Sequence, residues 1–506
     1  MATAQFDRSS GILLHPTSLP NSGGIGTLGK EAYDFIDFLV TAKQSLWQIC
    51  PLGPTGYGDS PYQCFSAYAG NPYLIDLEEL RKQGLLTSLE LEPLKKLPTN
   101  FVDFGALIPL KMNILLKAYG RFLGIFRKSD TACRVKKAQF EHFQKKEAYW
   151  LDDYSLFMVL KDQFGGESWD KWPQEYRTRD VSTLEGVRKE KTREIGFHEF
   201  LQFIFFGQWR ALRNYANTHG VKIIGDMPIF IAYDSADSWS RPEVFLFDSQ
   251  GRPTHVAGVP PDYFSATGQL WGNPLYNWDY LEKTGFRWWI DVLKNKLTFY
   301  DYLRIDHFRG FSAYWKITYG ETTAINGEWV TAPGKKLFAA VKGELGNPPI
   351  IAEDLGVITP DVKELIEYCD FPGMKILQFA FDSGEDNDHL PHTAVPNSLM
   401  YTGTHDNNTI HGWFAQAPEQ DKEMARRYLK IQRTSNLHWD FVQGVMASVS
   451  VFAITPVQDL LGLGPEARFN FPGTLGKNWT WRMKKSALTA NLGRRLADLT
   501  ELYGRF

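Results

Sequence analysis

Three acidic residues each follow a short apolar run that favours a β-strand. Asp306 follows Tyr300–Ile305, Glu353 stands in the stretch I-I-A-E-D-L-G, and Asp406 stands in T-G-T-H-D-N-N-T. Burying a charged side chain at the end of a strand is costly unless the side chain is paired or used. In an α/β barrel the active residues lie at the carboxyl ends of parallel strands, so we expect the three carboxylates to meet at one mouth.

Basic neighbours accompany these carboxylates. Arg304 and His307 flank Asp306, and His405 precedes Asp406. A magnesium or calcium site would need a cage of oxygen ligands, so these neighbours fit acid–base chemistry on an organic substrate better. We therefore predict no metal and no cofactor. A metal site and a set of separate structural ion pairs remain the alternatives.

Two carboxyl groups with opposed tasks are what cleavage of a glycosidic bond requires. Arg304 would keep Asp306 ionised as a nucleophile, and the nearby anion would keep Glu353 protonated as the acid for the leaving oxygen. Glu353 could then act as the base in a second step. Asp406 with His405 could bind sugar hydroxyls and stabilise the distorted ring in the transition state.

The elements that must position these residues are short strands that alternate with helical patterns. Eight such strands are predicted, the number that closes a (β/α)8 barrel. Their ranges are Gly11–His15, Leu46–Leu52, Lys222–Phe230, Tyr300–Ile305, Pro349–Ala352, Met374–Phe379, Ser398–Thr402 and Val451–Thr455.

We predict one catalytic barrel domain over residues 1–506, with two insertions. Residues 80–194, after the second strand, have helical spacing of Leu, Lys, Glu and aromatic residues and form a mainly helical inserted subdomain. Residues 232–276, after the third strand, are rich in Pro, Gly, Ser and aromatics and form an inserted loop subdomain. About 50 residues follow the last strand, too few for a C-terminal β-sandwich domain.

The stretches R-I-D-H-F-R-G-F, I-A-E-D-L-G and G-T-H-D-N-N-T together resemble the α-amylase clan, and within it the 4-α-glucanotransferases of glycoside hydrolase family 77, also called amylomaltases or disproportionating enzymes. Further stretches carry the same resemblance from near Gly11 to about Trp481. They are P-T-S-L-P, P-L-G-P-T-G-Y-G-D-S-P-Y-Q, G-D-M-P-I, G-V-P-P-D-Y-F and F-P-G-T.

The resemblance implies Asp306 as nucleophile, Glu353 as general acid/base and Asp406 as stabiliser of the transition state. It also implies that Arg304 and His405 bind sugar and carboxylate groups, and that Asp226 is the acidic residue of the third strand. We assign His307 and Asn407, their neighbours in these motifs, to substrate binding.

The loop 260–274 resembles a lid-like loop of amylomaltases, which implies that it covers the substrate and stacks aromatic rings on the acceptor. Its candidate contacts are Tyr263, Phe264, Gln269 and Trp271. A proline-stiffened surface loop with core-facing aromatics is the alternative. Asp59 and Tyr62 are candidates for a further sugar contact, although their glycine-rich setting is equally compatible with a turn.

The predicted reaction is transfer of an α-1,4-glucan segment to the 4-hydroxyl of an acceptor sugar, with retention of configuration. Transfer requires that a bound sugar outcompete water, which a lid of aromatics can achieve by orienting the acceptor and excluding solvent. An α-amylase-like hydrolase is the alternative enzyme, and a non-catalytic glucan-binding protein on the same scaffold is the alternative class.

Composition limits the partners. A formal net charge of -3, with both signs interspersed, provides no basic field for nucleic acid. The four cysteines form no C-x-x-C pair, and no run is long enough to span a bilayer. We therefore expect a cytoplasmic protein that binds α-1,4-glucans and malto-oligosaccharides, with no membrane partner, as a monomer or weak homodimer.

Overall fold

The computed structural model describes residues 6–126, 131–261, 265–356, 358–474 and 476–506. Eight parallel strands form its central sheet, in the order β10-β11-β12-β1-β2-β3-β6-β9. The two end strands also meet, since the Ala352 backbone N–H donates to the Pro372 carbonyl at 3.0 Å. The strands are β1 (Ser9–Leu13), β2 (Leu46–Gln48), β3 (Lys222–Pro228), β6 (Tyr302–Asp306), β9 (Ile350–Ala352), β10 (Gly373–Ile376), β11 (Ser398–Tyr401) and β12 (Phe452–Pro456).

Each predicted strand overlaps one of these strands, so the predicted (β/α)8 barrel is confirmed. Seven of the eight strands contribute buried side chains to one cluster that fills the barrel interior, and the partly buried Tyr302 of β6 packs against it. The side chains that alternate with them along the strands join a second, larger core under the surrounding helices. In β3, for example, Ile224 points inward and Ile223 points outward. Burial on both faces explains why apolar residues predominate in these runs.

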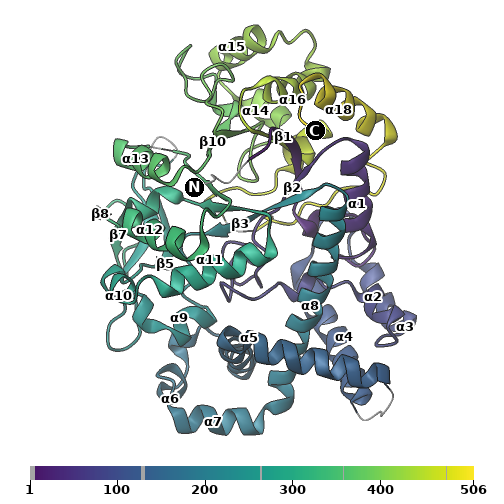
Figure 1. The fold of residues 1–506 in the computed structure, drawn as a ribbon, viewed down its shortest axis with the longest axis vertical. Helices are drawn as coiled ribbons and strands as arrows, with labels where there is room; N and C mark the ends of the chain where they lie inside the picture. The colour runs from purple at the N-terminus through teal and green to yellow at the C-terminus, as the bar shows by residue number, and fades with distance from the viewer. Residues whose placement is uncertain (1–5, 127–130, 262–264, 357, 475) are drawn as a thin grey trace.

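Helices surround the barrel, as Figure 1 shows. Their apolar faces supply the outer core; Phe35, Ile36 and Leu39 do so from the first helix. The helices that follow barrel strands include α1 (Lys30–Thr41), α11 (Arg287–Phe299), α12 (Gly334–Leu345), α13 (Pro360–Cys369), α16 (Leu437–Ala447) and α18 (Ala490–Leu502).

Long helices occupy the connection between β2 and β3 and form the lower part of the molecule in Figure 1. The longest are α4 (Phe104–Ile125), α5 (Thr131–Gln163) and α8 (Thr192–Thr218). α5 packs against α8, whose last turn leads back into the barrel at β3. No helix within the described part of the chain combines the length and apolar character needed to cross a membrane.

A second, four-stranded sheet was not predicted from the sequence. Its order is β5-β4-β7-β8, and all its pairings are antiparallel. Two of its strands lie within residues 232–276, and the other two follow β6. They are β4 (His255–Val259), β5 (Gln269–Pro274), β7 (Ala313–Thr318) and β8 (Gly327–Thr331).

Candidate active site

The polar residues of the site lie at the carboxyl ends of the barrel strands. Asp226 is in β3, Asp306 is the last residue of β6, and Glu353 directly follows β9. Asp406 lies five residues after β11. Because all these strands are parallel members of one barrel, the carboxylates converge on one mouth.

Arg304 connects two of the carboxylates. Its Nη1 donates to both oxygens of Asp226 at 2.8 and 2.6 Å, and its Nη2 donates to Asp306 Oδ1 at 2.8 Å. Arg304 and Asp306 belong to the same strand with one residue between them, so their side chains leave the sheet on the same face. The guanidinium is buried, and the Asp306 side chain is about one-third exposed. Asp306 is thus an oriented carboxylate that a substrate can reach.

Asp226 holds Arg304 from the neighbouring strand. It also accepts a hydrogen bond of 2.9 Å from the Tyr62 hydroxyl. Burial raises the pKa of Asp226 to about 6, although Arg304 opposes the shift. The carboxylate is still the ionised form at neutral pH. Its position fixes the guanidinium, so Asp226 contributes to the site through Arg304.

Among the described residues, Glu353 is held by backbone N–H groups and not by a charged side chain. The backbone N–H groups of His307 and Leu355 donate to its two oxygens at 2.6 and 2.8 Å. Burial, followed by the Asp306 charge, raises the pKa of Glu353 to about 8. This carboxyl group therefore carries a proton at neutral pH while Asp306 beside it is paired with Arg304. The mouth provides one acid and one anion.

The backbone turn after Asp306 makes this arrangement possible. His307 adopts a left-handed conformation with φ of 51°, which is uncommon for a residue other than glycine. In this conformation its N–H reaches Glu353. Its ring packs edge-on against Trp271 of β5, with ring centroids 4.7 Å apart. The predicted loop residue Trp271 therefore lies beside the mouth.

Asp406 has its own partners. His405 Nε2 lies 3.3 Å from Asp406 Oδ2, and the Asn470 amide donates to Asp406 Oδ1 at 2.5 Å. Burial alone would raise the pKa of Asp406, but His405 and Asn470 outweigh it and lower this pKa to about 2. The ring of Tyr62 stacks on His405 at 5.2 Å, so Tyr62 touches both the Asp226 side and the Asp406 side of the mouth.

Two residues of the C-terminal segment complete this side and were not predicted. Asn470 binds the Asp406 carboxylate, and Arg468 donates to the Asp406 backbone carbonyl at 2.7 Å. They are more than 60 residues away along the chain. The only sequence signal was the adjacent stretch F-P-G-T, which marked the segment but not these side chains.

The other residues predicted to bind substrate differ in how they are connected to the mouth. The Asn407 amide oxygen accepts from the backbone and hydroxyl of Thr404, so it braces the loop of Asp406. Gln269 accepts from the Trp271 indole N–H at 3.2 Å. No side-chain hydrogen bond or ion pair joins Asp59 to the other mouth residues that the structure describes. Tyr263 and Phe264 lie outside the described residues.

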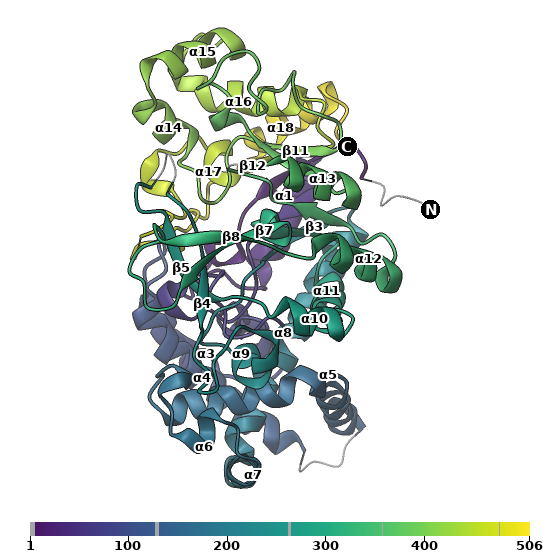
Figure 2. The ribbon, with the colours of Figure 1, turned by 90° about the vertical axis from the view of Figure 1, so that its left-hand side faces the viewer.

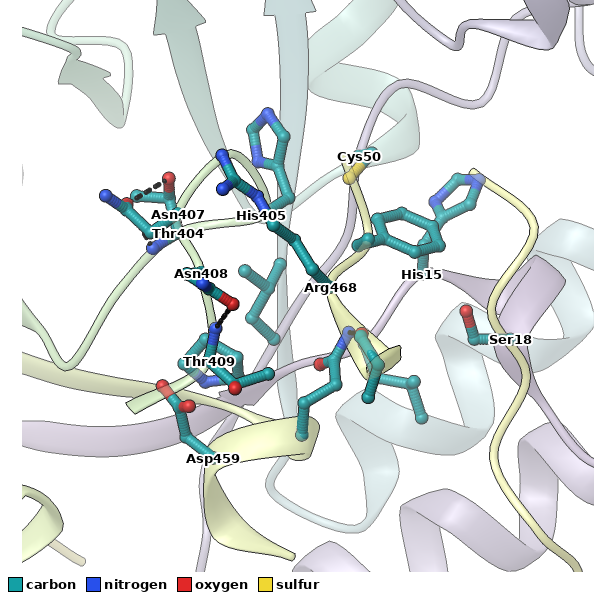
Figure 3. Close-up of a pocket in the computed structure, with 16 residues that line it drawn as sticks. His15, Ser18, Cys50, Thr404, His405, Asn407, Asn408, Thr409, Asp459 and Arg468 are labelled. Carbon is teal, nitrogen blue, oxygen red and sulfur yellow. Dashed lines mark hydrogen bonds between the residues drawn. The ribbon is translucent and has the colours of Figure 1, made fainter. Parts of the chain in front are cut away.

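A pocket adjoins the mouth at His405, and Figure 3 shows its lining. Asn407 and Thr404 lie on one side of the view, His15 lies on the other, and the Arg468 side chain runs between them. Burial lowers the pKa of His15 to about 3, so this imidazole is neutral. Asp459 binds the Thr402 hydroxyl at 2.7 Å and the Ile410 N–H at 2.8 Å. The pocket extends the site with a lining of both polar and apolar side chains.

Across the described ranges, no three His, Cys, Asp or Glu side chains are grouped as ligands for a metal ion. The carboxylates instead contact an arginine, a histidine, an asparagine and backbone N–H groups. With these partners, one carboxylate can attack a carbon centre, and another carboxyl group can protonate a leaving oxygen.

Comparisons with known proteins agree with this chemistry. The profile of a family described as 4-alpha-glucanotransferase matches residues 14–489. The 4-alpha-glucanotransferase of Thermus thermophilus is 48% identical over 504 residues, covering 98% of this chain and 99% of the relative. That of Clostridium butyricum is 47% identical over 496 residues, covering 97% of this chain and all of the relative.

Among solved structures, the amylomaltase from Streptococcus agalactiae in complex with acarbose superposes with a TM-score of 0.94. Its sequence is 42% identical, and the match covers 98% of this chain and 99% of that one. The similarity therefore spans the barrel and both inserted regions.

Proposed function

Since the chain belongs to the 4-alpha-glucanotransferase family and is an enzyme that transfers α-1,4-glucan segments, we propose that Asp306, Glu353 and Asp406 carry out this transfer. The observation that supports these roles is the contrast between the first two. Asp306 is oriented as an anion by Arg304, whereas the buried Glu353 retains its proton. A retaining glycosidic mechanism needs this pair of states at the start of its cycle.

In the first step, the Asp306 carboxylate attacks the anomeric carbon of the donor. The bond to the leaving O4 breaks, and Glu353 donates its proton to that oxygen. The donor segment is then an ester of Asp306. Neutralising Asp306 in this way removes the neighbouring negative charge, so Glu353 can stay ionised once it has lost its proton.

In the second step, the acceptor sugar presents its 4-hydroxyl. Glu353 removes the proton, the oxygen attacks the anomeric carbon, and the Asp306 carboxylate leaves. Both enzyme groups return to their starting states. Because the carbon is inverted twice, its configuration is retained.

The remaining residues position the sugar. Asp406 is held ionised by His405 and Asn470 and is suited to bind sugar hydroxyls in the distorted transition state. Arg304, Asp226, Tyr62 and His307 orient the reacting carboxylates. Trp271 and Gln269 are part of the loop 260–274, for which we propose acceptor binding and exclusion of water.

Incubation with maltotriose tests this proposal. Transfer yields free glucose together with oligomers longer than maltotriose, whereas hydrolysis yields only glucose and maltose. Replacing Asp306 by Asn should abolish both sets of products, because no anion remains to form the ester. If Asp306→Asn still remodels maltotriose at the wild-type rate, the assignment of the nucleophile is wrong.

We also propose a cytoplasmic enzyme that is a monomer or weak homodimer, with residues 80–194 as a helical subdomain. Supporting the location, Cys50 and Cys369 are buried thiols in no disulfide. Sedimentation at micromolar concentration and fractionation of the source cells test these statements.

A further inference from the structure

An apolar row crosses one face of the four-stranded sheet. Trp315 of β7 is paired directly with Trp329 of β8 on one side and with Gly258 of β4 on the other, and Gly258 is paired with Leu270 of β5. Directly paired residues have their side chains on the same face of a sheet. Leu270, Trp315 and Trp329 therefore share a face.

The two faces of this sheet have different surroundings. On the opposite face, Tyr314 and Val330 pack against the main core of the molecule. On the face with the tryptophans, a small cluster of Val256, Ile317, Ala324 and Trp315 is separate from that core. The row is thus on the outer face of the sheet, and its two ends are open, with Leu270 37% and Trp329 42% exposed.

Trp329 is held firmly although it is exposed. The Arg309 guanidinium lies over its ring, 4.0 Å from the centroid, and Trp315 packs edge-on against it at 5.3 Å. Trp315 is fixed in turn, because its indole N–H donates to the Ala324 carbonyl at 2.9 Å. An indole held in place in this way can bind a ligand with little loss of side-chain entropy.

The Trp329 end of the row contacts the segment that leaves the mouth of the barrel. Arg309 is three residues after Asp306, in the short helix η7 (Phe308–Phe311). At the other edge of the sheet, Trp271 of β5 contacts His307 from the opposite face, because it directly follows Leu270 in the strand. In Figure 2 the sheet lies on the left, on the side of the molecule away from the N-terminus. Arg309 therefore connects Trp329 directly to the segment that follows Asp306.

We propose that Trp329, with Leu270 and Trp315 behind it, is a binding site for a linear α-1,4-glucan several sugars away from the bond that is cut. The flat apolar face of a glucose ring matches an exposed indole, and a long glucan is a ligand whose outer sugars lie beyond the mouth. This inference rests on the proposed function, since it requires a glucan in the mouth.

The test compares substrates of different length. For Trp329→Ala we expect KM for long linear amylose to rise about three- to tenfold, the range expected for losing one aromatic contact. Both kcat and KM for maltotriose should be unchanged, because maltotriose is too short to reach Trp329. Trp329→Phe, which keeps a ring, should give an intermediate KM for amylose.

Tyr368→Ala is the matched control. Tyr368 is 44% exposed and also has a cation, Lys342, over its ring, but it lies on α13. Its loss should leave both KM values unchanged. Retardation in a native gel containing amylose gives a binding readout that does not depend on turnover, and Trp329→Ala should migrate faster in it than wild type.

Several results would overturn the inference. An unchanged KM for amylose in Trp329→Ala would exclude a glucan contact, and an equal rise of KM for maltotriose would assign the ring a structural role. A wild-type dimer that Trp329→Ala dissociates would assign the row to a contact between two copies. A wild-type enzyme without transfer activity on maltotriose would instead reject the proposed function itself.

Discussion

A single guanidinium, that of Arg304, links Asp306 to Asp226 of the neighbouring strand. Arg304 donates hydrogen bonds to both oxygens of Asp226 but to only one oxygen of Asp306. Asp226 thereby fixes the plane of Arg304 and leaves the second Asp306 oxygen without a bond to it. An ammonium group could not reproduce this planar fork between two acids.

We therefore expect Arg304→Lys to lower kcat for maltotriose disproportionation at least about 100-fold, the usual effect of removing a preorganised electrostatic contact. Lysine keeps the positive charge, so a lower kcat would result from the lost geometry of the guanidinium. Arg482→Lys is the control, because Arg482 is equally buried but binds backbone carbonyls of Leu19, Asn21 and Pro98. It should lower the melting temperature and leave kcat unchanged. Near-normal turnover by Arg304→Lys would contradict the role given to the fork.

Glu353 leads to a prediction about pH. Because its pKa is raised to about 8, kcat/KM should fall above about pH 8, where the free enzyme loses the proton needed by the leaving chain. A rate profile between pH 5 and 10 checks this. An alkaline limb absent up to pH 10 would exclude Glu353 as the acid.

The same shift affects stability. A carboxyl group whose pKa is higher in the folded protein stabilises the fold fully below its unfolded value of 4.5, and this contribution is lost as pH rises toward 8. The Glu353→Gln variant has no carboxyl group at this position, so its stability lacks this dependence on pH. The melting temperature of wild type should therefore fall relative to that of Glu353→Gln between pH 5 and 8, whatever the constant offset between them.

The residue types of the site were predictable from the sequence, but their environments were not. The neighbouring Asp306 charge was expected to keep Glu353 protonated, whereas burial is the larger cause. Burial depends on the packing of distant segments. Asn470 was missed for a related reason, since an asparagine has no charge pattern to mark it and its partner is 64 residues away.

At the scale of elements, apolar runs predicted all eight barrel strands because each is buried on both faces. Their ends were less accurate. Predicted strand Leu46–Leu52 stops at Gln48 in the structure, before Pro51. The strands of the second sheet were missed because β5 and β8 are partly exposed and mix polar, aromatic and glycine residues, so neither has a clear apolar run.

The second sheet, which was not predicted from the sequence, leads to a testable prediction about Trp271 of β5. Trp271 packs on His307, so its removal should open the mouth to water. We expect Trp271→Ala to raise the fraction of glycosyl ester lost to hydrolysis severalfold. The measurement is the number of reducing ends, which transfer leaves constant and hydrolysis increases. Trp271→Phe keeps a ring and should stay near wild type; an equal rise in both variants would argue against ring packing as the cause.

At the scale of the whole molecule, a largely buried ion pair joins the two inserted regions to each other. Lys161 of α5 is buried and donates to Asp234, which follows β3, at 2.6 Å. It also donates to the carbonyls of Gly166 and Glu167. The helical region is in this way tied to the segment that leads into the second sheet.

Removing this lysine should weaken the connection without reaching the chemistry. We expect Lys161→Met to destabilise the protein by about 2 kcal/mol, below the usual cost of breaking a buried pair because Asp234 is 30% exposed and water can screen it. Lys146→Met is the control, since Lys146 is on the same helix but exposed, and it should change stability by less than about 0.5 kcal/mol. Urea unfolding measures both. Lys161→Met should leave kcat for maltotriose unchanged at a temperature where it is fully folded. Within the described ranges, the hydrogen bonds of the carboxylates come from barrel strands, the segments that follow them and the C-terminal segment. A lower kcat would therefore mean that the helical region contributes to the mouth directly.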